Sequence, residues 1–253
     1  MAQLPPVRRQ VVVPAGAEVA FAVFTDEIGT WWPVELGHSV FGAGADVSLR
    51  DRQVVETSPD GEQAVWGTIV DWEPPRRLRM TWHPGHGPDQ ATEVEVRFEP
   101  VGDQTLVTLE HRGWERMADP WGTRRAYNRG WPTVMGRYVA KAPAQAVAAG
   151  DEAWLVLAHT PGAAPAQTAD GGSIFAHPDF GEHLAFLRRL ADEGVLVAAG
   201  PVDPDRGEGM TVVRLKDPAA IAELTRRAQD EDQSVARELL QVRVRPWRVA
   251  LAG

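Results

Sequence analysis

Residues 180–201 read FGEHLAFLRRLADEGVLVAAGP, a helical pattern followed at once by a strand pattern. From Asp179 to Glu193 the apolar residues recur at steps of three and four, as they do on one face of an α-helix. Gly194 follows, and glycine is the usual residue after the last turn of a helix. The next residues, Val195 to Ala199, are continuously apolar and predict a buried strand that ends at Gly200-Pro201.

The sequence on either side extends this pattern into six elements. Trp154 to Ala158 is an apolar run of strand length, and Met210 to Leu215 predicts another strand. A helix is expected over 217–228, because Asp217 is a good N-cap and proline at position 218 suits the first turn. Apolar residues alternate with arginines from Val242 onward, as in a half-buried strand. The order βαββαβ predicts a ferredoxin-like domain of the α+β class.

The N-terminal half predicts a different α+β arrangement, a curved antiparallel sheet that grips a long helix. A strand is expected at 7–13 and a short helix at 17–24. Further strands are separated by turns rich in Pro, Gly and Asp; they are 47–56, 64–72, 77–82, 93–98 and 105–111. A helix from Trp131 to Ala140 presents apolar residues that suit the dry face of this sheet. The predicted fold is a helix-grip.

Motifs spaced through the C-terminal half resemble the YCII-related (YciI-like) family. They are His183-Leu184-Ala185-Phe186-Leu187, Ala199-Gly200-Pro201, Gly209-Met210, Asp232-Gln233-Ser234-Val235 and Val244-Arg245-Pro246-Trp247. The resemblance covers about residues 151–250. It implies a dimeric α+β barrel, hence a homodimer through this domain, in which His183 and Asp232 form an active-site dyad. The family usually has proline after this aspartate, whereas the chain has Gln233.

Residues of the N-terminal half resemble the SRPBCC (START-like) superfamily, within it the AHSA1-like group related to the Hsp90 ATPase activator homology domain. They are Val13-Pro14-Ala15, Trp31-Trp32, Gly67-Thr68-Ile69-Val70, Pro74-Pro75-Arg76-Arg77-Leu78, Thr81-Trp82 and Gly130-Trp131. The resemblance covers about residues 7–141. It implies an apolar cavity between sheet and helix that holds a small hydrophobic ligand. An Hsp90-type cochaperone is a weaker alternative, since the rest of such an activator is absent.

Length and composition agree with two domains, an SRPBCC/AHSA1-like domain at 1–141 and a YCII-related domain at 152–253, joined by an Ala/Pro/Gly linker at 142–151. The chain has 253 residues, 43% hydrophobic and 24% charged, and no apolar run of the roughly 20 residues that a membrane span needs. Its net charge of −9 disfavours nucleic acid as a partner. No secretory signal is visible, so a cytoplasmic location is expected. The absence of cysteine excludes disulfides and thiolate chemistry.

His183 and Asp232 are the predicted catalytic residues. An imidazole titrates near working pH, and a carboxylate on one ring nitrogen fixes its tautomer and stabilises its protonated form. A hydrogen-bonded core histidine and a helix N-cap explain the two residues about equally well. His159 and His177 are expected near strand and helix ends and are candidates to converge with His183. Their spacing matches no known ligand motif, so neither a metal nor a cofactor is predicted.

The N-terminal cavity is expected to be walled by aromatic side chains. Strand parity and the last helix point five residues inward, and these are the predicted ligand-binding residues: Trp66, Trp82, His111, Met135 and Tyr138. The predicted partner is a small apolar or aromatic molecule. Two functions remain open at this point. One is a lyase or isomerase that uses His183 and Asp232; the other is a ligand-binding or dimerisation protein without turnover.

Overall fold

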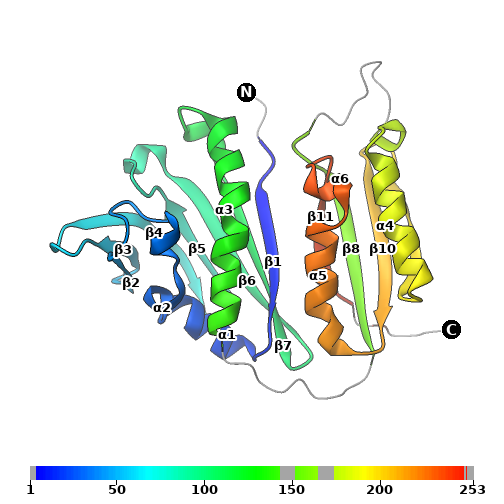
Figure 1. The fold of residues 1–253 in the computed structure, drawn as a ribbon, viewed down its shortest axis with the longest axis horizontal. Helices are drawn as coiled ribbons and strands as arrows, with labels where there is room; N and C mark the ends of the chain where they lie inside the picture. The colour runs from blue at the N-terminus through cyan, green and yellow to red at the C-terminus, as the bar shows by residue number, and fades with distance from the viewer. Residues whose placement is uncertain (1–3, 143–151, 165–173, 248, 250–253) are drawn as a thin grey trace. The chain divides into compact units, whose positions relative to one another are not determined.

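The computed structural model describes residues 4–142, 152–164, 174–247 and 249. The chain divides into two compact units, residues 1–146 and 147–253 (Figure 1). Of the predicted linker 142–151, residues 143–151 lie outside the described residues. No helix in the described ranges is long and apolar enough to cross a membrane.

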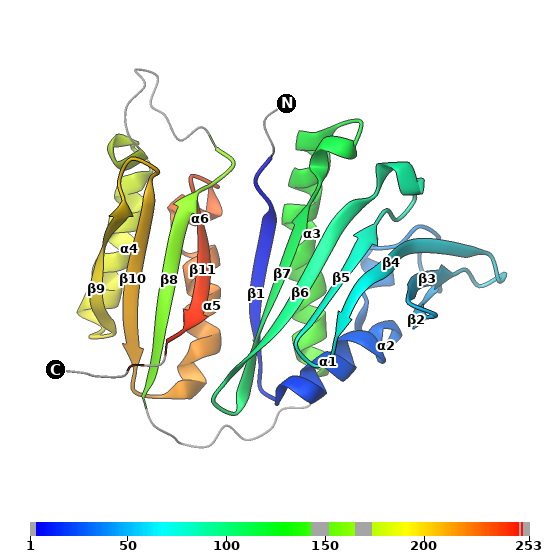
Figure 2. The same ribbon diagram turned by 180° about the vertical axis from the view of Figure 1, so that it is seen from behind.

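The N-terminal unit is a curled antiparallel sheet of seven strands in the order β1-β7-β6-β5-β4-β3-β2. Its strands are β1 (Val7–Val13), β2 (Asp46–Arg50), β3 (Gln53–Thr57), β4 (Gln63–Glu73), β5 (Arg77–Trp82), β6 (Thr92–Val101) and β7 (Gln104–Arg112). Its helices are α1 (Ala17–Thr25), α2 (Ile28–Trp31), α3 (Pro120–Lys141) and the 3-10 turns Val34–Leu36, Pro88–Gln90 and Trp114–Arg116. Figures 1 and 2 show α3 along one face of the sheet. This arrangement is consistent with a helix-grip.

Alternation of side chains along the strands builds the core of this unit. On β5, Leu78, Met80 and Trp82 are buried, while Arg77 and Arg79 point to the other face. There Arg79 pairs with carboxylates of neighbouring strands, at 2.7 Å from Asp71. The buried face packs against α1 and α3 and is rich in aromatic rings.

One predicted strand, 47–56, is wrong, because the structure has the hairpin β2–β3 there. Asp51 and Arg52 form its two-residue turn, with φ of +48° and +63°. Such turns favour Asn-Gly or Asp-Gly because both central residues have positive φ. Arg52 in the glycine position removed the sequence signal.

The predicted helix Trp131–Ala140 is too short, because α3 begins at Pro120. The Asp119 carboxylate accepts a hydrogen bond from the Gly122 N–H at 3.0 Å and caps the helix. Proline follows the cap, as it does at Asp217-Pro218. The glycines and Pro132 within α3 interrupt its helical pattern, so the sequence did not predict that the helix begins at Pro120.

The C-terminal unit is a four-stranded antiparallel sheet in the order β11-β8-β10-β9. Its elements in chain order are β8 (Ala153–Pro161), the 3-10 turn Ile174–Ala176, α4 (Phe180–Asp192), β9 (Leu196–Asp203), β10 (Glu208–Leu215), the 3-10 turn Pro218–Ala220, α5 (Ile221–Asp230), α6 (Gln233–Ala236) and β11 (Leu240–Pro246). In Figures 1 and 2, α4 and α5 lie on the same side of this sheet. Leu155 and Leu157 of β8 and Phe186 and Leu190 of α4 are fully buried between them.

The prediction of a buried strand at Val195–Ala199 is wrong about burial. β9 begins at Leu196, forms the edge of the sheet and is exposed along most of its length. Val197 is 50% exposed and Val202 63%. The apolar run had suggested a central strand, but this edge leaves apolar side chains uncovered in the single chain.

Candidate functional site

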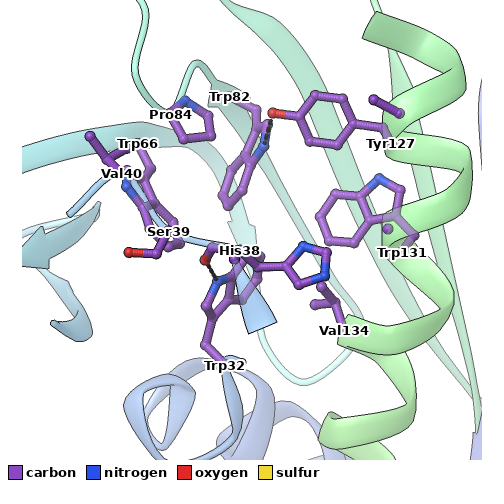
Figure 3. Close-up of a pocket in the computed structure, with 13 residues that line it drawn as sticks. Trp32, His38, Ser39, Val40, Trp66, Trp82, Pro84, Tyr127, Trp131 and Val134 are labelled. Atoms are coloured by element: carbon purple, nitrogen blue, oxygen red, sulfur yellow. Dashed lines mark hydrogen bonds between the residues drawn. The ribbon is translucent and has the colours of Figure 1, made fainter. Parts of the chain in front are cut away.

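The N-terminal unit contains a cavity of about 360 Å³ between the sheet, α3 and the loop after α2 (Figure 3). Four tryptophans from four parts of the chain form most of its wall. Trp66 lies on β4, Trp82 on β5 and Trp131 on α3, and Trp32 follows α2. The other lining residues are Gly37, His38, Ser39, Val40, Pro84, Ala126, Tyr127, Gly130 and Val134.

The polar edge of each indole is already bonded within the protein. Trp32 Nε1 donates to the His38 carbonyl at 2.7 Å, and Trp66 Nε1 donates to Glu56 at 3.0 Å. Trp82 Nε1 donates to the Tyr127 hydroxyl at 3.1 Å, and Trp131 Nε1 donates to His111 Nδ1 at 3.2 Å. The indoles therefore offer apolar and π surface to an occupant rather than N–H donors.

Glu56 of β3 holds the loop at one side of this cavity. Its carboxylate is fully buried and accepts hydrogen bonds from Val40 N at 2.8 Å and Phe41 N at 3.2 Å. The Ser39 hydroxyl and the Trp66 indole donate to it as well. One carboxylate thus fixes both the loop and a wall tryptophan.

Two polar side chains remain for recognition, Tyr127 and His38. Burial raises the pKa of Tyr127 to about 12, against a smaller opposing effect of the Trp82 N–H. Tyr127 is therefore protonated at neutral pH, and with Trp82 bonded to its oxygen, its own O–H is available to donate. Burial also lowers the pKa of His38, an effect that Glu35 opposes. Figure 3 shows the His38 ring directed towards Trp131 and Val134.

Of the five residues predicted to bind ligand, Trp66 and Trp82 line the cavity. His111, Met135 and Tyr138 are not among the lining residues and are essentially inaccessible to solvent. His111 Nε2 lies 2.7 Å from Thr92 Oγ1, and burial holds the pKa of His111 well below its ordinary value. The Tyr138 hydroxyl donates to the Ala20 carbonyl at 2.7 Å. These three residues belong to the buried core next to the side chains that line the cavity.

Trp32, His38, Tyr127 and Trp131 line the cavity without having been predicted. The Trp31-Trp32 pair was a visible signal, but a pair of adjacent residues does not reveal which ring faces inward. Tyr127 lies in a segment that was not predicted to be helical. Recognising Asp119-Pro120 as a helix start would have placed it on the same element as Trp131.

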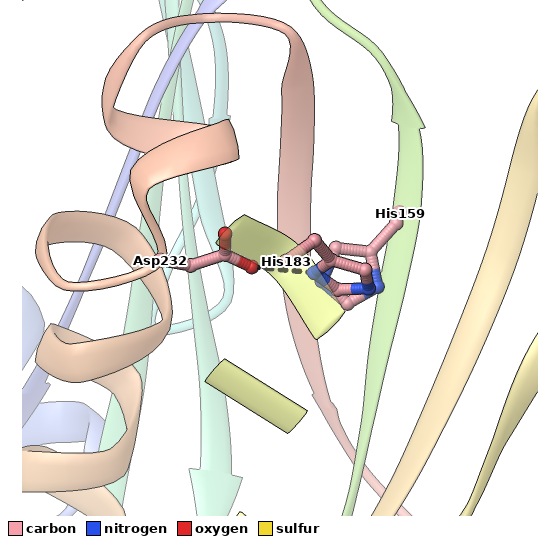
Figure 4. A group of neighbouring side chains, drawn as sticks. All are labelled: His159, His183 and Asp232. Carbon is pink, nitrogen blue, oxygen red and sulfur yellow. Dashed lines mark hydrogen bonds and ion pairs between the residues drawn. The ribbon is translucent and has the colours of Figure 1, made fainter. Parts of the chain in front are cut away.

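The C-terminal unit brings His183, Asp232 and His159 together (Figure 4). His183 lies on α4, and its Nδ1 is 2.6 Å from Asp232 Oδ2. Asp232 is fully buried at the N-cap of α6, where its Oδ1 accepts a hydrogen bond from Ser234 N at 3.1 Å. The carboxylate therefore caps a helix with one oxygen and contacts His183 with the other.

His159 of β8 approaches His183 with a ring-centroid distance of 4.6 Å. It is 3% exposed, and neither ring nitrogen has a hydrogen-bond partner among the described residues. Burial lowers the pKa of His159 to about 3; the neighbouring His183 adds to this effect, while Asp232 and the Leu157 backbone oppose it. His177 does not belong to this group of three, and its Nδ1 accepts a hydrogen bond from Asp179 N at 3.1 Å.

A cavity of about 170 Å³ adjoins this cluster, with both His159 and His183 in its lining. Apolar side chains supply most of the remaining wall, together with Ala199, Gly200 and Pro201 of β9. They include Phe175, Phe180, Leu184, Leu187 and Met210. Two imidazoles therefore border a small apolar space.

Comparison with known protein families shows which kind of domain the N-terminal unit contains. The model of the family "Activator of Hsp90 ATPase homolog 1-like protein" matches residues 14–139. Residues 14–139 therefore form an AHSA1-like domain of SRPBCC type, in agreement with the resemblance in the sequence.

Three of the solved structures that are similar to this chain have different descriptions. The anthrahydroquino-γ-pyrone synthase Txn09 is 31% identical over 55% of this chain and 99% of its own, with a TM-score of 0.40. The self-sacrificing resistance protein CalC of Micromonospora echinospora is 26% identical over 55% and 94%, with a TM-score of 0.39. The Aha1 dimer of Colwellia psychrerythraea is 17% identical over 56% and 96%, with a TM-score of 0.41. No curated protein matches the chain.

Proposed function

We propose that the N-terminal unit binds a small planar aromatic molecule. The observation that carries this proposal is the cavity wall of four tryptophans whose indole N–H groups are all bonded within the protein. Stacked or edge-to-face aromatic contacts contribute roughly 0.5–1.5 kcal/mol each beyond the area that they bury. A flat ring system gains several of them at once, whereas a saturated molecule of the same size gains burial alone.

The size and polarity of the cavity narrow the ligand class further. A volume of about 360 Å³ lies at the lower end of ligand sites in proteins, roughly 300–1,000 Å³, and suits two or three fused rings. The Tyr127 hydroxyl favours a ligand with one hydrogen-bond acceptor at the α3 side. The expected ligand is thus an oxygenated arene without a charge.

Substitution of one wall residue tests this proposal. We expect Trp82→Leu to weaken the binding of 2-naphthol to the full chain by about tenfold, since it removes one ring face and the partner of Tyr127. Trp121→Leu is the matched control, because Trp121 lies on the same unit but is 52% exposed and outside the cavity lining. Calorimetry measures the affinity for 2-naphthol, and circular dichroism checks that both proteins are folded. If folded Trp82→Leu binds 2-naphthol as tightly as the wild type does, this cavity is not the binding site.

The His183–Asp232 contact favours a second function, acid–base catalysis of the lyase or isomerase type in the C-terminal unit. The 2.6 Å distance lies in the range that a carboxylate needs to orient an imidazole, and the adjacent cavity gives a substrate access to His183. We propose that this unit is a ferredoxin-like domain of the YCII-related family. The strand order β11-β8-β10-β9 and the βαββαβ order of its main elements support this assignment.

Hydrogen–deuterium exchange of small carbon acids tests the catalytic proposal without knowledge of the natural substrate. We expect the full chain to accelerate the exchange of α-protons in at least one of a panel of simple cyclic ketones in D₂O, whose uncatalysed exchange is slow at neutral pH. His183→Gln should lose that acceleration, because glutamine cannot transfer the proton. His177→Gln is the control outside the cluster. Acceleration that persists in His183→Gln would exclude His183 as the catalytic group.

The exposed apolar residues of the C-terminal sheet support a homodimer through this unit. Val197, Val202 and Met210 are between 41% and 63% exposed in the single chain. Monomeric proteins rarely leave a large contiguous apolar surface uncovered, and a second copy of this unit presents the same apolar residues. The partner proposed for this surface is a second copy of the chain.

A further inference from the structure

His159 is a buried polar group of the C-terminal unit that the proposed acid–base reaction does not use. Its ring is 3% exposed, and both nitrogens lack hydrogen-bond partners in the described part of the chain. An unpaired polar group in an apolar interior is costly, so a partner that compensates for this burial is expected. The neighbouring polar side chains are His183 and Asp232.

Asp232 does not supply that partner, since its carboxylate contacts Ser234 and His183 and makes no hydrogen bond to either ring nitrogen of His159. Oδ1 accepts from Ser234 N at 3.1 Å, and Oδ2 lies 2.6 Å from His183 Nδ1. This contact directs the Nδ1 proton to the carboxylate and leaves the lone pair on His183 Nε2. A carboxylate behind a histidine in this way is the usual support of a metal-ligating imidazole, whose tautomer and orientation it fixes.

We propose that His159 and His183 bind a divalent transition-metal ion, with Asp232 as the outer carboxylate. One donor atom of each of the three residues lies within 4.8 Å of those of the other two, so the two imidazoles are close enough to bind the same ion. Neutral imidazole is a good ligand for Zn²⁺, Co²⁺, Ni²⁺ and Cu²⁺. Water or substrate in the adjoining cavity supplies the remaining ligands.

This inference concerns the same His183 as the proposed acid–base reaction but does not rest on that function. An ion on Nε2 would take the place of the imidazole as the acidic group, since a metal-bound water ionises near neutral pH. His159 is essential only for the metal site. The two proposals therefore separate experimentally: loss of metal binding in His159→Gln with ketone exchange unchanged would retain His183 as the acid–base group.

Calorimetric titration of the chelator-treated full chain with Zn²⁺ alone tests the proposal. We expect one ion per chain, binding weakened by tenfold or more in His159→Gln, and binding weakened by about 10- to 100-fold in Asp232→Asn, the usual effect of removing an outer partner. His177→Gln is the matched control, because this histidine lies in the same unit but outside the cluster, and it should bind as the wild type does.

A second measurement on the wild type guards against a variant that fails to fold. Zn²⁺ should shift the imidazole NMR signals of His159 and His183 together, and Co²⁺ should broaden them. Absence of saturable Zn²⁺ binding, unchanged affinity in His159→Gln, or Zn²⁺ binding that moves only the signals of other histidines would each overturn the metal site. The last outcome would identify the ion as adventitious.

Discussion

At the residue scale, two buried carboxylates organise the two candidate sites. Glu56 accepts four hydrogen bonds and ties the loop after α2 to Trp66, while Asp232 ties α6 to His183. Buried acceptors of this kind are costly to leave without donors, and equally costly to remove when several donors depend on them. Substitutions at these two residues should therefore affect both stability and the geometry of each site.

Replacement of Asp232 by alanine should destabilise the C-terminal unit by about 3 kcal/mol. The variant loses a charge-assisted hydrogen bond to His183 and the N-cap of α6, and leaves the Ser234 N–H without its acceptor. Asp232→Asn should cost less, since the amide oxygen can still cap the helix. Urea denaturation followed by circular dichroism checks the order of the two variants. Equal stability of Asp232→Ala and the wild type would show that the contact does not hold in solution.

Replacement of Glu56 by glutamine should weaken 2-naphthol binding, although Glu56 does not line the cavity. The neutral amide accepts fewer and weaker hydrogen bonds, so the loop that carries His38 and Ser39 loses its anchor. A fall in affinity of about threefold to tenfold is expected by calorimetry, with Glu62→Gln on the exposed β3–β4 turn as control. Unchanged affinity would mean that the loop is held without the charge.

The pH dependence of stability should report on His159. Its pKa falls from 6.5 in the unfolded chain to about 3 in the fold, so below pH 6.5 only the unfolded chain takes up this proton. The contribution of neutral His159 to the free energy of unfolding is fully present above pH 6.5. It is lost as the pH falls towards 3, by about 1.4 kcal/mol per pH unit for one proton. Between about pH 4 and 6, the unfolding free energy of His159→Gln should therefore change less with pH than that of the wild type, by about 1.4 kcal/mol per pH unit. Identical slopes for variant and wild type would contradict the buried neutral imidazole.

At the element scale, the close packing of two backbones in the N-terminal sheet leaves no room for a side chain at one glycine. A Cβ on Gly67 of β4 would lie 1.9 Å from the Thr81 carbonyl oxygen of β5, whereas a Cβ on Gly136 of α3 would meet no atom within 4 Å. The same change, Gly to Ala, should thus have opposite effects at the two positions. One strand must separate from its neighbour, while the helix gains propensity.

We expect Gly67→Ala to lower the melting temperature strongly or to prevent folding of this unit. Gly136→Ala should raise stability by roughly 0.5–1 kcal/mol, the difference between the helix propensities of the two residues. Thermal denaturation of the two variants in parallel measures both effects. A mild effect of Gly67→Ala would contradict the close approach of β4 and β5.

The elements also show what the sequence could predict. Strands with strict alternation, such as β5, and helices with clear apolar faces, such as α4, agree with their predicted positions to within a few residues. The β2–β3 hairpin was missed because Asp51-Arg52 lacks the glycine of a typical two-residue turn, and the first half of α3 because glycine and proline interrupt its pattern. The second miss affected the site, since the unpredicted part of α3 carries Tyr127.

Side-chain direction was predictable only in part. Alternation pointed Trp66 and Trp82 inward, but it could not separate a cavity wall from the core behind it, where His111 and Tyr138 lie. The approach of His159 to His183 depends on how α4 packs across β8, which no local pattern encodes. Only contacts between residues distant in the sequence reveal such a cluster.

At the scale of the whole molecule, the chain combines two units with separate cavities, one aromatic and one bordered by imidazoles. Its proposed assembly is a homodimer through the C-terminal unit. Met210→Glu places a charge on the exposed apolar surface of that unit and should convert a dimer into a monomer, as judged by light scattering after size-exclusion chromatography. Trp121→Glu, a comparable change on the N-terminal unit, should leave the dimer intact. A wild-type monomer at high micromolar concentration would contradict the dimer.

The central claim is that four tryptophans select a flat aromatic ligand. The most direct test is the calorimetric titration of the wild-type chain with 2-naphthol and with decahydro-2-naphthol, which share a carbon skeleton and a hydroxyl group but differ in planarity and π surface. We predict that 2-naphthol binds at least about tenfold more tightly, since only it gains aromatic contacts with the wall. Equal affinity for the two alcohols, or no binding of either, would contradict the account.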